Sequence, residues 1–231
     1  MTAVFITGAT SGIGKQLALD YAKQGWQVIA CGRNQSVLDS LHTQYANIFP
    51  LAFDVTDHPG TKAALAQLPC QPELWILNAG DCEYIDDGKM DVTLMARVFN
   101  INVLGVAAGI EGIQPHLSCG HRVAIVGSIA SELALPRAEA YGASKAAVAY
   151  LARTLQLDWR PLGIEVTTIF PGFVATPLTD RNTFAIQEIK AGLARGVSQL
   201  YFPKRFTWLI RLLGALPYAW QGRLVRRLLK A

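Results

Sequence analysis

A glycine-rich turn near the start of the chain constrains its fold most strongly. The run Thr7-Gly8-Ala9-Thr10-Ser11-Gly12-Ile13-Gly14 follows the apolar segment Ala3–Thr7 and leads into a helical pattern over Ile13–Gln24. Glycines let the backbone turn tightly and approach a phosphate, and the free N–H groups at the start of the helix favour an anion. A strand, a turn and a helix in this order indicate a nucleotide-binding α/β protein. An ordinary glycine-rich turn is the alternative.

Short apolar segments alternate with helical patterns along the rest of the chain. Because most of these segments are apolar throughout, we expect strands that are buried on both faces of a parallel sheet. The pattern predicts a single doubly wound α/β domain over residues 1–231, with about seven parallel strands and helices on both faces. The predicted strands are Ala3–Thr7, Gln27–Cys31, Ile48–Phe53, Leu74–Leu77, Arg122–Val126, Ile164–Phe170 and Gln199–Phe202. The predicted helices are Ile13–Gln24, Gln35–Gln44, Thr61–Gln67, Asp91–Leu117, Ala140–Arg160 and two more in the tail.

The cysteines and the N-terminus indicate a reducing compartment. Cys31, Cys70, Cys82 and Cys119 form no Cys-x-x-Cys pair and have no histidine at metal-ligand spacing, so we predict no metal site. The segment Val4-Phe5-Ile6 runs directly into the glycine turn with no basic region before it, which favours a first strand over a signal peptide. We therefore expect reduced thiols in a cytoplasmic protein.

A tyrosine, a lysine and a serine together suggest proton-transfer chemistry. Tyr141 and Lys145 are four residues apart, which places them on one face of a helix. A nearby cation favours the phenolate form of tyrosine, so its pKa should fall from about 10 toward neutrality. Ser128 follows the predicted strand Arg122–Val126, and strand ends carry ligand chemistry in α/β sheets. Such a set can hold and protonate a carbonyl oxygen while a hydride is added. Ser131 is a nearby alternative to Ser128.

The glycine turn and these three residues resemble the short-chain dehydrogenase/reductase family, of the classical type. The family's loop, Thr-Gly-x-x-x-Gly-x-Gly, is matched from Thr7 to Gly14, and its serine precedes its tyrosine by thirteen residues, as Ser128 precedes Tyr141. The resemblance runs from about Ala3 to Pro177. It implies a Rossmann-type fold and an NAD(P)-dependent oxidoreductase that interconverts a carbonyl and an alcohol.

The same resemblance implies roles for the catalytic residues. Tyr141 would donate or accept the proton, and Ser128 would hold the substrate oxygen. Asn102, which is followed by Gly105 at the family's spacing, would hold a water that links Lys145 to solvent. Asparagine is unfavourable inside a helix, which supports a special role for it. The predicted catalytic residues are Asn102, Ser128, Tyr141 and Lys145.

The residues after the second predicted strand favour NADP over NAD. Gly32 leaves room where an acidic residue would bind the ribose 2′-hydroxyl of NAD. Arg33 offers a planar guanidinium that can pair with the 2′-phosphate of NADP. We therefore predict NADP(H) as the preferred cofactor and NAD(H) as the weaker one. A solvated Arg33 is the alternative.

Three further segments match cofactor-binding positions of the family. The resemblance implies that Asp54-Val55 contacts adenine, although Asp54 could equally cap a turn or a helix. It implies that Asn78-Ala79-Gly80 passes close to the cofactor and that the segment from Pro171 to Thr176 contacts the nicotinamide carboxamide. The predicted cofactor-binding residues are Gly8, Thr10, Ser11, Gly12, Ile13, Gly14, Arg33, Asp54, Val55, Asn78, Ala79, Gly80, Tyr141, Lys145, Pro171, Gly172, Val174 and Thr176.

The C-terminal part differs from the rest in charge. From Lys190 to Ala231 there are nine Lys or Arg and no Asp or Glu, whereas residues 1–189 are acidic overall. Residues 178–200 are expected to form a substrate lid, and residues 203–231 a basic amphipathic tail. In the last helix Arg223, Arg226, Arg227 and Lys230 share one face and leucines occupy the other, which is typical of an interfacial helix. The tail would contact a membrane surface, or it would pack on its own domain or a sister subunit.

These features predict partners and leave one alternative of another class. We expect a small-molecule carbonyl or alcohol substrate, lipid-like if the tail meets a membrane. The resemblance implies a homodimer or homotetramer through the helices 91–117 and 140–160. The alternative is a non-catalytic NADP-binding sensor or membrane-associated scaffold, which would not need Ser128, Tyr141 and Lys145. Nucleic-acid binding is disfavoured because no base-stacking arrangement accompanies the basic tail.

Overall fold

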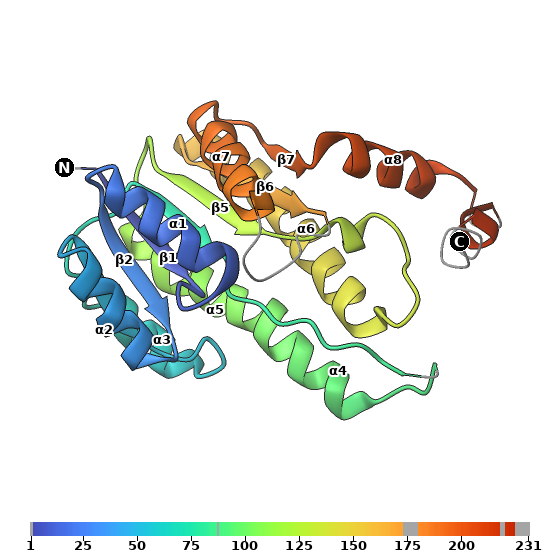
Figure 1. The fold of residues 1–231 in the computed structure, drawn as a ribbon, viewed down its shortest axis with the longest axis horizontal. Coiled ribbons are helices and arrows are strands. Elements are labelled where there is room, and N and C mark those ends of the chain that lie inside the picture. The colour runs from blue at the N-terminus through green and yellow to red at the C-terminus, as the bar shows by residue number, and fades with distance from the viewer. Residues whose placement is uncertain (1, 87, 173–179, 218–219, 225–231) are drawn as a thin grey trace.

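The structure is a computed structural model that describes residues 2–86, 88–172, 180–217 and 220–224. A seven-stranded parallel sheet forms its centre, with strand order β3-β2-β1-β4-β5-β6-β7 (Figure 1). This confirms the predicted doubly wound sheet, and the strand order reverses between β1 and β4. The strands are β1 (Ala3–Thr7), β2 (Gln27–Gly32), β3 (Ile48–Ala52), β4 (Leu74–Leu77), β5 (Arg122–Val126), β6 (Glu165–Pro171) and β7 (Gln199–Phe202).

Helices cover both faces of the sheet (Figure 1). The helices are α1 (Gly12–Lys23), α2 (Gln35–Gln44), α3 (His58–Leu65), α4 (Val92–Phe99), α5 (Gly105–Ile113), α6 (Glu139–Trp159), α7 (Asp180–Ala194) and α8 (Lys204–Ala215). Asn34, Asp57 and Asp91 cap α2, α3 and α4, because each side chain accepts a hydrogen bond from a backbone N–H in the first turn.

Two apolar clusters fill the space between the sheet and its helices. On β1, Val4 and Ile6 pack with α1, α2 and α7, whereas Phe5 between them packs with α3, α5 and α6 on the other face. Successive side chains of a strand point to opposite faces, so a strand buried on both sides is apolar throughout. This arrangement explains the unbroken apolar segments in the sequence.

The predicted helix Asp91–Leu117 is interrupted. The α-helices α4 and α5 are joined by a π-helical segment, Asn100–Leu104, which contains the buried Asn102. Single π turns inside α-helices often mark functional sites. By length and hydropathy the stretch Val92–His116 could cross a membrane. However, Val106, Ile110 and Ile113 on it are buried in the core beside the sheet, as expected for a core helix of an α/β protein.

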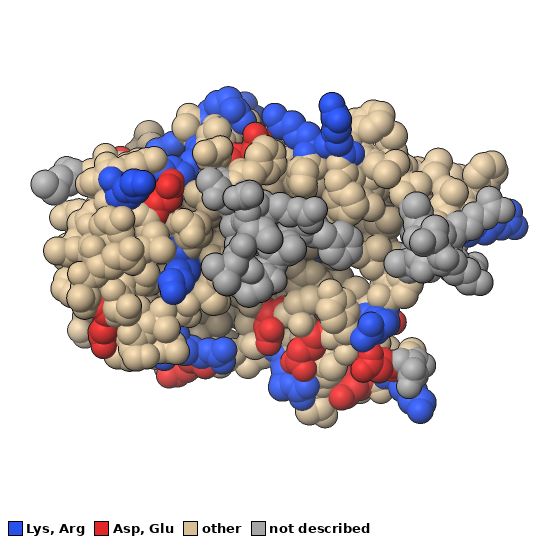
Figure 2. Space-filling model, in the orientation of Figure 1, with Lys and Arg blue, Asp and Glu red and all other residues tan. Residues whose placement is uncertain are grey.

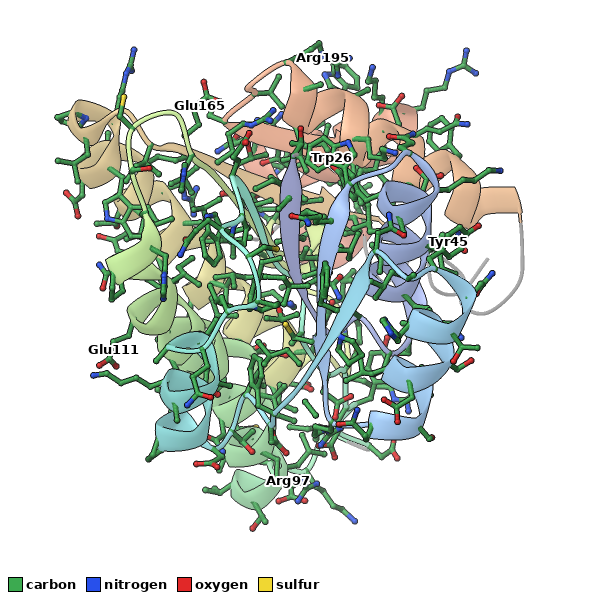
Figure 3. The ribbon with its side chains drawn as sticks, turned by 90° about the vertical axis from the view of Figure 1, so that its left-hand side faces the viewer. Trp26, Tyr45, Arg97, Glu111, Glu165 and Arg195 are labelled. Carbon is green, nitrogen blue, oxygen red and sulfur yellow. The ribbon has the colours of Figure 1, made fainter. Side chains whose placement is uncertain are left out.

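The two ends of the sheet differ in what they carry. Figure 3 places Trp26, Glu165 and Arg195 at the end where the strands begin and Arg97 at the opposite end. Arg97 pairs with Glu83, which lies in the loop that follows β4. The predicted functional residues lie at this second end, where the parallel strands terminate, as expected for an α/β sheet.

The C-terminal elements pack on the domain only in part. From residue 184 onward α7 lies beside α1, and its Lys190 pairs with Asp20. The predicted lid function of residues 178–200 stays a prediction, since residues 173–179 lie outside the described part. Helix α8 follows β7 and extends away from the sheet (Figure 1). Residues 220–224 are helical, but Arg226, Arg227 and Lys230 of the predicted basic face are not among the described residues.

Candidate active site

The glycine turn lines a cavity of about 260 Å³, which we call the glycine-loop cavity. Its walls come from the ends of β1, β2, β3 and β4, four neighbouring strands. It brings together most of the residues predicted for the adenosine and phosphate side of a nucleotide. Predicted residues on its wall are Gly8, Thr10, Ser11, Arg33, Asp54, Val55, Ala79 and Gly80.

Three glycines of the turn are needed for different reasons. Gly8 and Gly12 have positive φ angles of 67° and 51°, which other residues adopt only under strain. Gly14 lies at the start of α1 against the turn, and a Cβ there would lie 2.3 Å from the Gly8 carbonyl oxygen. The turn therefore holds the first helix close to the strand end. Ile13 lies on the wall of a second cavity, described below, with Asn78.

Arg33 and Asp54 face each other in the glycine-loop cavity. Their nearest charged atoms, Arg33 Nη1 and Asp54 Oδ2, are 3.7 Å apart. Asp54 also accepts hydrogen bonds from the backbone N–H and the hydroxyl of Thr56. It therefore caps a turn, which was the alternative to an adenine contact. Burial raises the pKa of Asp54, but the Thr56 hydrogen bonds and the Arg33 guanidinium outweigh this effect and lower the pKa below its ordinary value.

A second cavity of about 300 Å³, the Tyr141 cavity, shares Gly80 and Asp81 with the first. Ser128, Tyr141 and Lys145 all lie on its wall, so the structure brings together three of the four residues predicted to be catalytic. Ser128 follows β5, and its hydroxyl accepts a hydrogen bond from the Ala130 backbone N–H. The alternative serine, Ser131, donates its hydroxyl to the Ser128 carbonyl and is not part of this wall.

Lys145 is buried and held in place. Its Nζ donates a hydrogen bond of 2.9 Å to the Val126 carbonyl and lies 5.9 Å from the centre of the Tyr141 ring. Burial lowers the pKa of Lys145 to about 8. The Lys145 side chain is thus fixed near the Tyr141 ring, and it carries its positive charge mainly below pH 8.

The fourth predicted catalytic residue, Asn102, lies just behind this wall. Its Oδ1 accepts from the Asp81 backbone N–H, and its Nδ2 donates to the Asp81 carbonyl and to the Ser144 hydroxyl. A Cβ on Gly80 would lie 3.0 Å from Asn102 Oδ1 and 3.2 Å from Lys145 Nζ. A side chain at position 80 would therefore press on both groups, and glycine leaves that space free.

Tyr141 departs from expectation in its ionisation. Burial raises its pKa above 10, while a hydrogen bond with Ser128 opposes this effect. We expected Lys145 to lower the pKa of Tyr141 toward neutrality. Burial lowers the pKa of Lys145 itself, however, and Lys145 Nζ lies 5.9 Å from the centre of the Tyr141 ring. In this state the phenol keeps its proton, and it can donate that proton to an oxygen placed between Tyr141 and Ser128.

A third cavity of about 300 Å³ opens beside Ser128 and Tyr141. We call it the apolar cavity, because Ile129, Leu135 and Pro136 from the loop after β5 contribute to its wall. None of its described lining side chains is charged. Such a space can receive the body of a molecule whose reactive oxygen lies at Ser128 and Tyr141. The structure also contains a larger hollow, of about 710 Å³, behind the same loop, but the predicted residues do not line it.

Several site residues were not predicted from the sequence. Asp81 and Cys82 line the Tyr141 cavity, Tyr84 lines the apolar cavity, and Ser144 binds Asn102. The first three follow Asn78-Ala79-Gly80 after a strand end, and Ser144 directly precedes Lys145. Their positions next to predicted motifs were therefore the one signal in the sequence that could have identified them. Pro171 and Gly172 lie on the wall of the Tyr141 cavity, whereas Val174 and Thr176 lie outside the described residues.

Comparison with known proteins gives the family. Residues 2–185 match the family described as short chain dehydrogenase. The chain is 32% identical to a sulfoacetaldehyde reductase of Chromohalobacter salexigens and 30% identical to a serine 3-dehydrogenase of Rhizobium radiobacter. Each alignment covers 85% of this chain and 82% of the relative.

A solved structure adds a relative with a bound cofactor. The closed form of a serine dehydrogenase complexed with NADP⁺ is 25% identical to this chain and superposes with a TM-score of 0.73. The match covers 94% of this chain and 90% of that protein. The likeness therefore extends beyond the glycine turn to almost the whole fold.

Proposed function

This chain belongs to the short-chain dehydrogenase family of oxidoreductases, and we propose that it reduces a carbonyl compound to an alcohol with NADPH. The observation that carries this proposal is the meeting of Ser128, Tyr141 and Lys145 on one cavity wall beside the glycine-loop cavity. A non-catalytic NADP sensor would not need these three side chains together.

Tyr141 is the proposed proton donor. When bound, the reduced nicotinamide supplies the hydride that is added to the carbonyl carbon. Tyr141 donates its proton to the carbonyl oxygen as that oxygen gains electrons, and the Ser128 hydroxyl donates a hydrogen bond to the same oxygen. The raised pKa of Tyr141 keeps the phenol protonated at neutral pH, which is the form that a proton donor needs.

Lys145 and Asn102 are proposed to return a proton to Tyr141. Lys145 is buried beside the tyrosine, and the lowered pKa of its ammonium group makes release of a proton easier. Asn102 is fixed by Asp81 and Ser144, and Gly80 leaves open space between Asn102 and Lys145. A water bound at that position would connect Lys145 with solvent.

The NADP preference rests on the residues of the glycine-loop cavity. The planar guanidinium of Arg33 lies at the end of β2, and Gly32 beside it carries no acid that would repel a 2′-phosphate. One solved structure that resembles this chain is complexed with NADP⁺ and another with NAD, so the proposed preference rests on Arg33 and Gly32. The remaining predicted cofactor residues, including Val174 and Thr176, are proposed to bind the nucleotide as the family resemblance implies.

The apolar cavity supports a neutral, apolar substrate. Serine and sulfoacetaldehyde, which the names of two relatives give as substrates, both carry charged groups. Here the described wall of the apolar cavity offers Ile129, Leu135 and Pro136 and no cation that could pair with a carboxylate or sulfonate. We therefore propose a carbonyl group on an apolar body, such as an aliphatic aldehyde or an oxo-lipid.

A homo-oligomer is part of the proposal. Leu104 before α5 and Tyr150 and Leu157 on α6 are 50%, 72% and 74% exposed. Large apolar side chains on two neighbouring helices favour contact with another copy of the chain.

The proposal is tested by following NADPH oxidation with matched neutral and anionic aldehydes, for example heptanal and succinic semialdehyde. We expect turnover of the neutral aldehyde and its loss in Tyr141→Phe. Turnover of the anionic aldehyde alone would refute the substrate class and keep the oxidoreductase. Tight NADPH binding without turnover of a broad panel would favour the sensor.

A further inference from the structure

The outer face of α8 exposes large apolar side chains at helical spacing. Trp208, Leu209 and Leu212 are 64%, 48% and 47% exposed, and Arg205 precedes them on the same face. Residues at positions i, i+3, i+4 and i+7 share one face of a helix, so these four form a single stripe. Trp220, in the helical segment 220–224 that follows α8, is also exposed, at 61%.

The opposite face of α8 is anchored on the loop that follows β5. Ile210 and Leu213 pack with Leu133 and Leu135 of that loop. Gly214 lies so close to this loop that a Cβ there would lie 2.3 Å from the Glu132 carbonyl oxygen. Because the inner face packs on this loop, the helix cannot turn, and the stripe on its outer face stays exposed to solvent.

Basic side chains surround the stripe. Arg205 and Arg223 are exposed and form no ion pair with the residues that the structure describes. Lys204 is 3.7 Å from Glu188, and Arg211 lies over the Tyr201 ring, so these two cations are partly engaged. The face drawn in Figure 2 shows tan and blue over α8, while a group of red carboxylates lies over α4.

We propose that this Trp208 face, consisting of Arg205, Trp208, Leu209 and Leu212, docks on an anionic lipid surface together with the exposed Trp220 and Arg223 of the segment that follows. Tryptophan is favoured at the membrane interface, because its ring is apolar and its N–H is polar. Arginine adds attraction to anionic headgroups. The chain has no Asp or Glu after Glu188. Two acidic residues from earlier in the chain lie near α8: Glu132 lines a hollow together with Trp208 and Arg211, and Glu188 faces Lys204.

A lipid surface fits this face better than a second tail does. Two copies of a segment with nine cations and no acid repel each other, whereas an anionic membrane attracts both. The loop of Leu133 and Leu135 packs on the inner face of α8, so docking through the outer face leaves this helix between the loop and the lipid. The docking itself does not depend on the proposed activity.

Vesicle sedimentation with the full chain tests this inference. The protein is mixed with phosphatidylcholine vesicles, with or without phosphatidylglycerol, and the bound fraction is measured at low and high salt. We expect binding to the anionic vesicles that weakens in high salt and is weak with phosphatidylcholine alone. The variant Arg205→Glu/Arg223→Glu should lower the partition coefficient about tenfold or more, since each basic residue near an anionic surface contributes roughly fivefold.

A second variant tests the apolar part of the face. Trp208→Ser/Leu212→Ser should lower binding to the anionic vesicles to a similar degree. The matched control is Arg160→Glu/Leu162→Ser, which changes an exposed arginine and an exposed leucine on one short turn after α6. This control should bind vesicles like the unaltered protein. NADPH binding and circular dichroism verify that each variant is folded.

The outcomes separate the alternatives. Absence of binding to anionic vesicles, or equal binding by folded α8 variants and the control, would overturn the proposal. If the α8 variants instead dissociate an oligomer in the absence of lipid, which ultracentrifugation detects, the Trp208 face contacts a second copy and the lipid proposal is wrong. Either result leaves the test of carbonyl reduction unaffected.

Discussion

Arg33 Nη1 lies 3.7 Å from Asp54 Oδ2 in the glycine-loop cavity. The cation proposed to bind the 2′-phosphate of NADP is therefore next to a carboxylate from the neighbouring strand end. Both side chains are partly exposed, so the pair is weak and a phosphate can displace the carboxylate. Asp54 remains bound to Thr56 when Arg33 turns away, because those hydrogen bonds are separate.

Because Arg33 and Asp54 form this pair, we expect substitutions of the two residues to change the KM for NADPH in opposite directions. Arg33→Ala should raise the KM for NADPH about 10- to 100-fold, since a hydrogen bond to a charged group contributes about 1.5–3 kcal/mol. The KM for NADH should change little, because NADH has no 2′-phosphate. Asp54→Asn removes the competing charge but keeps an amide oxygen for the proposed adenine contact, so it should lower the KM for NADPH by up to about fivefold. Steady-state kinetics with both cofactors measures these effects, and equal changes for NADPH and NADH would contradict the role of Arg33.

Tyr141→Phe removes the proposed proton donor and little else. We expect kcat to fall about a hundredfold to ten-thousandfold, which is the usual contribution of a general acid. The dissociation constant of NADPH should stay within about threefold, because the ring that remains still fills its position. Ser128→Ala should show the same pattern with a smaller loss.

Ser131→Ala is the matched control for Ser128→Ala. Its hydroxyl is bound to the Ser128 carbonyl and does not line the Tyr141 cavity. Its kcat should stay near that of the unaltered protein. If Ser131→Ala lost as much turnover as Ser128→Ala, the assignment of the serine would have to change.

Lys145 predicts a pH dependence of cofactor binding. Burial lowers its pKa to about 8 in the free protein, so the ammonium form is present below that pH and is lost above it. If the charged form binds the nucleotide, the dissociation constant of NADPH is constant below about pH 8 and rises above it, by at most about tenfold per pH unit. Fluorescence titration between neutral and alkaline pH measures this dependence. The Lys145→Met variant should bind NADPH more weakly, and its dissociation constant should not rise above pH 8. If the rise persists in this variant, another group causes the pH dependence.

Gly80→Ala tests whether the free space next to Asn102 and Lys145 matters for turnover. The added Cβ would lie 3.0 Å from Asn102 Oδ1 and 3.2 Å from Lys145 Nζ, so both groups must shift by a few tenths of an ångström. We expect a loss of kcat of about tenfold to a hundredfold, because small displacements of catalytic groups are costly. The thermal unfolding midpoint should change much less.

Gly109→Ala is the control for Gly80→Ala. Its Cβ would meet Leu77 at 3.4 Å, an ordinary contact, and it lies inside α5. Alanine is the better helix former, so the free energy of unfolding should rise by up to about 1 kcal/mol while kcat stays unchanged. If Gly109→Ala also lost activity, the effect of Gly80→Ala could be explained by altered helix packing, and it would not support a role for the space at Gly80.

The sequence predicted the fold and most of the site because both follow local rules. Strands buried on both faces need apolar residues throughout, and the glycine turn needs positive φ angles at Gly8 and Gly12. Each of these requirements leaves a mark within a few consecutive residues. For the same reason Ser128, Tyr141 and Lys145 could be named from their spacing and their positions after a strand and on a helix.

The raised pKa of Tyr141 could not be read in the same way. The spacing shows Lys145 near the ring, but it does not show how deeply either group is buried. In the structure burial raises the pKa of Tyr141 more than the Ser128 hydrogen bond lowers it, and burial also lowers the pKa of Lys145. The π-helical turn at Asn102 was missed too, because it depends on how α4 and the segment Asn100–Leu104 pack against α6.

The sequence by itself therefore determined the parallel α/β fold, the glycine turn and the family. Only the tertiary structure decided that Arg33 faces Asp54, that Gly80 leaves free space next to Asn102 and Lys145, and that α8 turns Trp208 outward while it packs on the loop after β5. The physical reason is distance along the chain. Backbone conformation is set by neighbouring residues, whereas these contacts join residues from separate elements and exist only once the sheet has assembled.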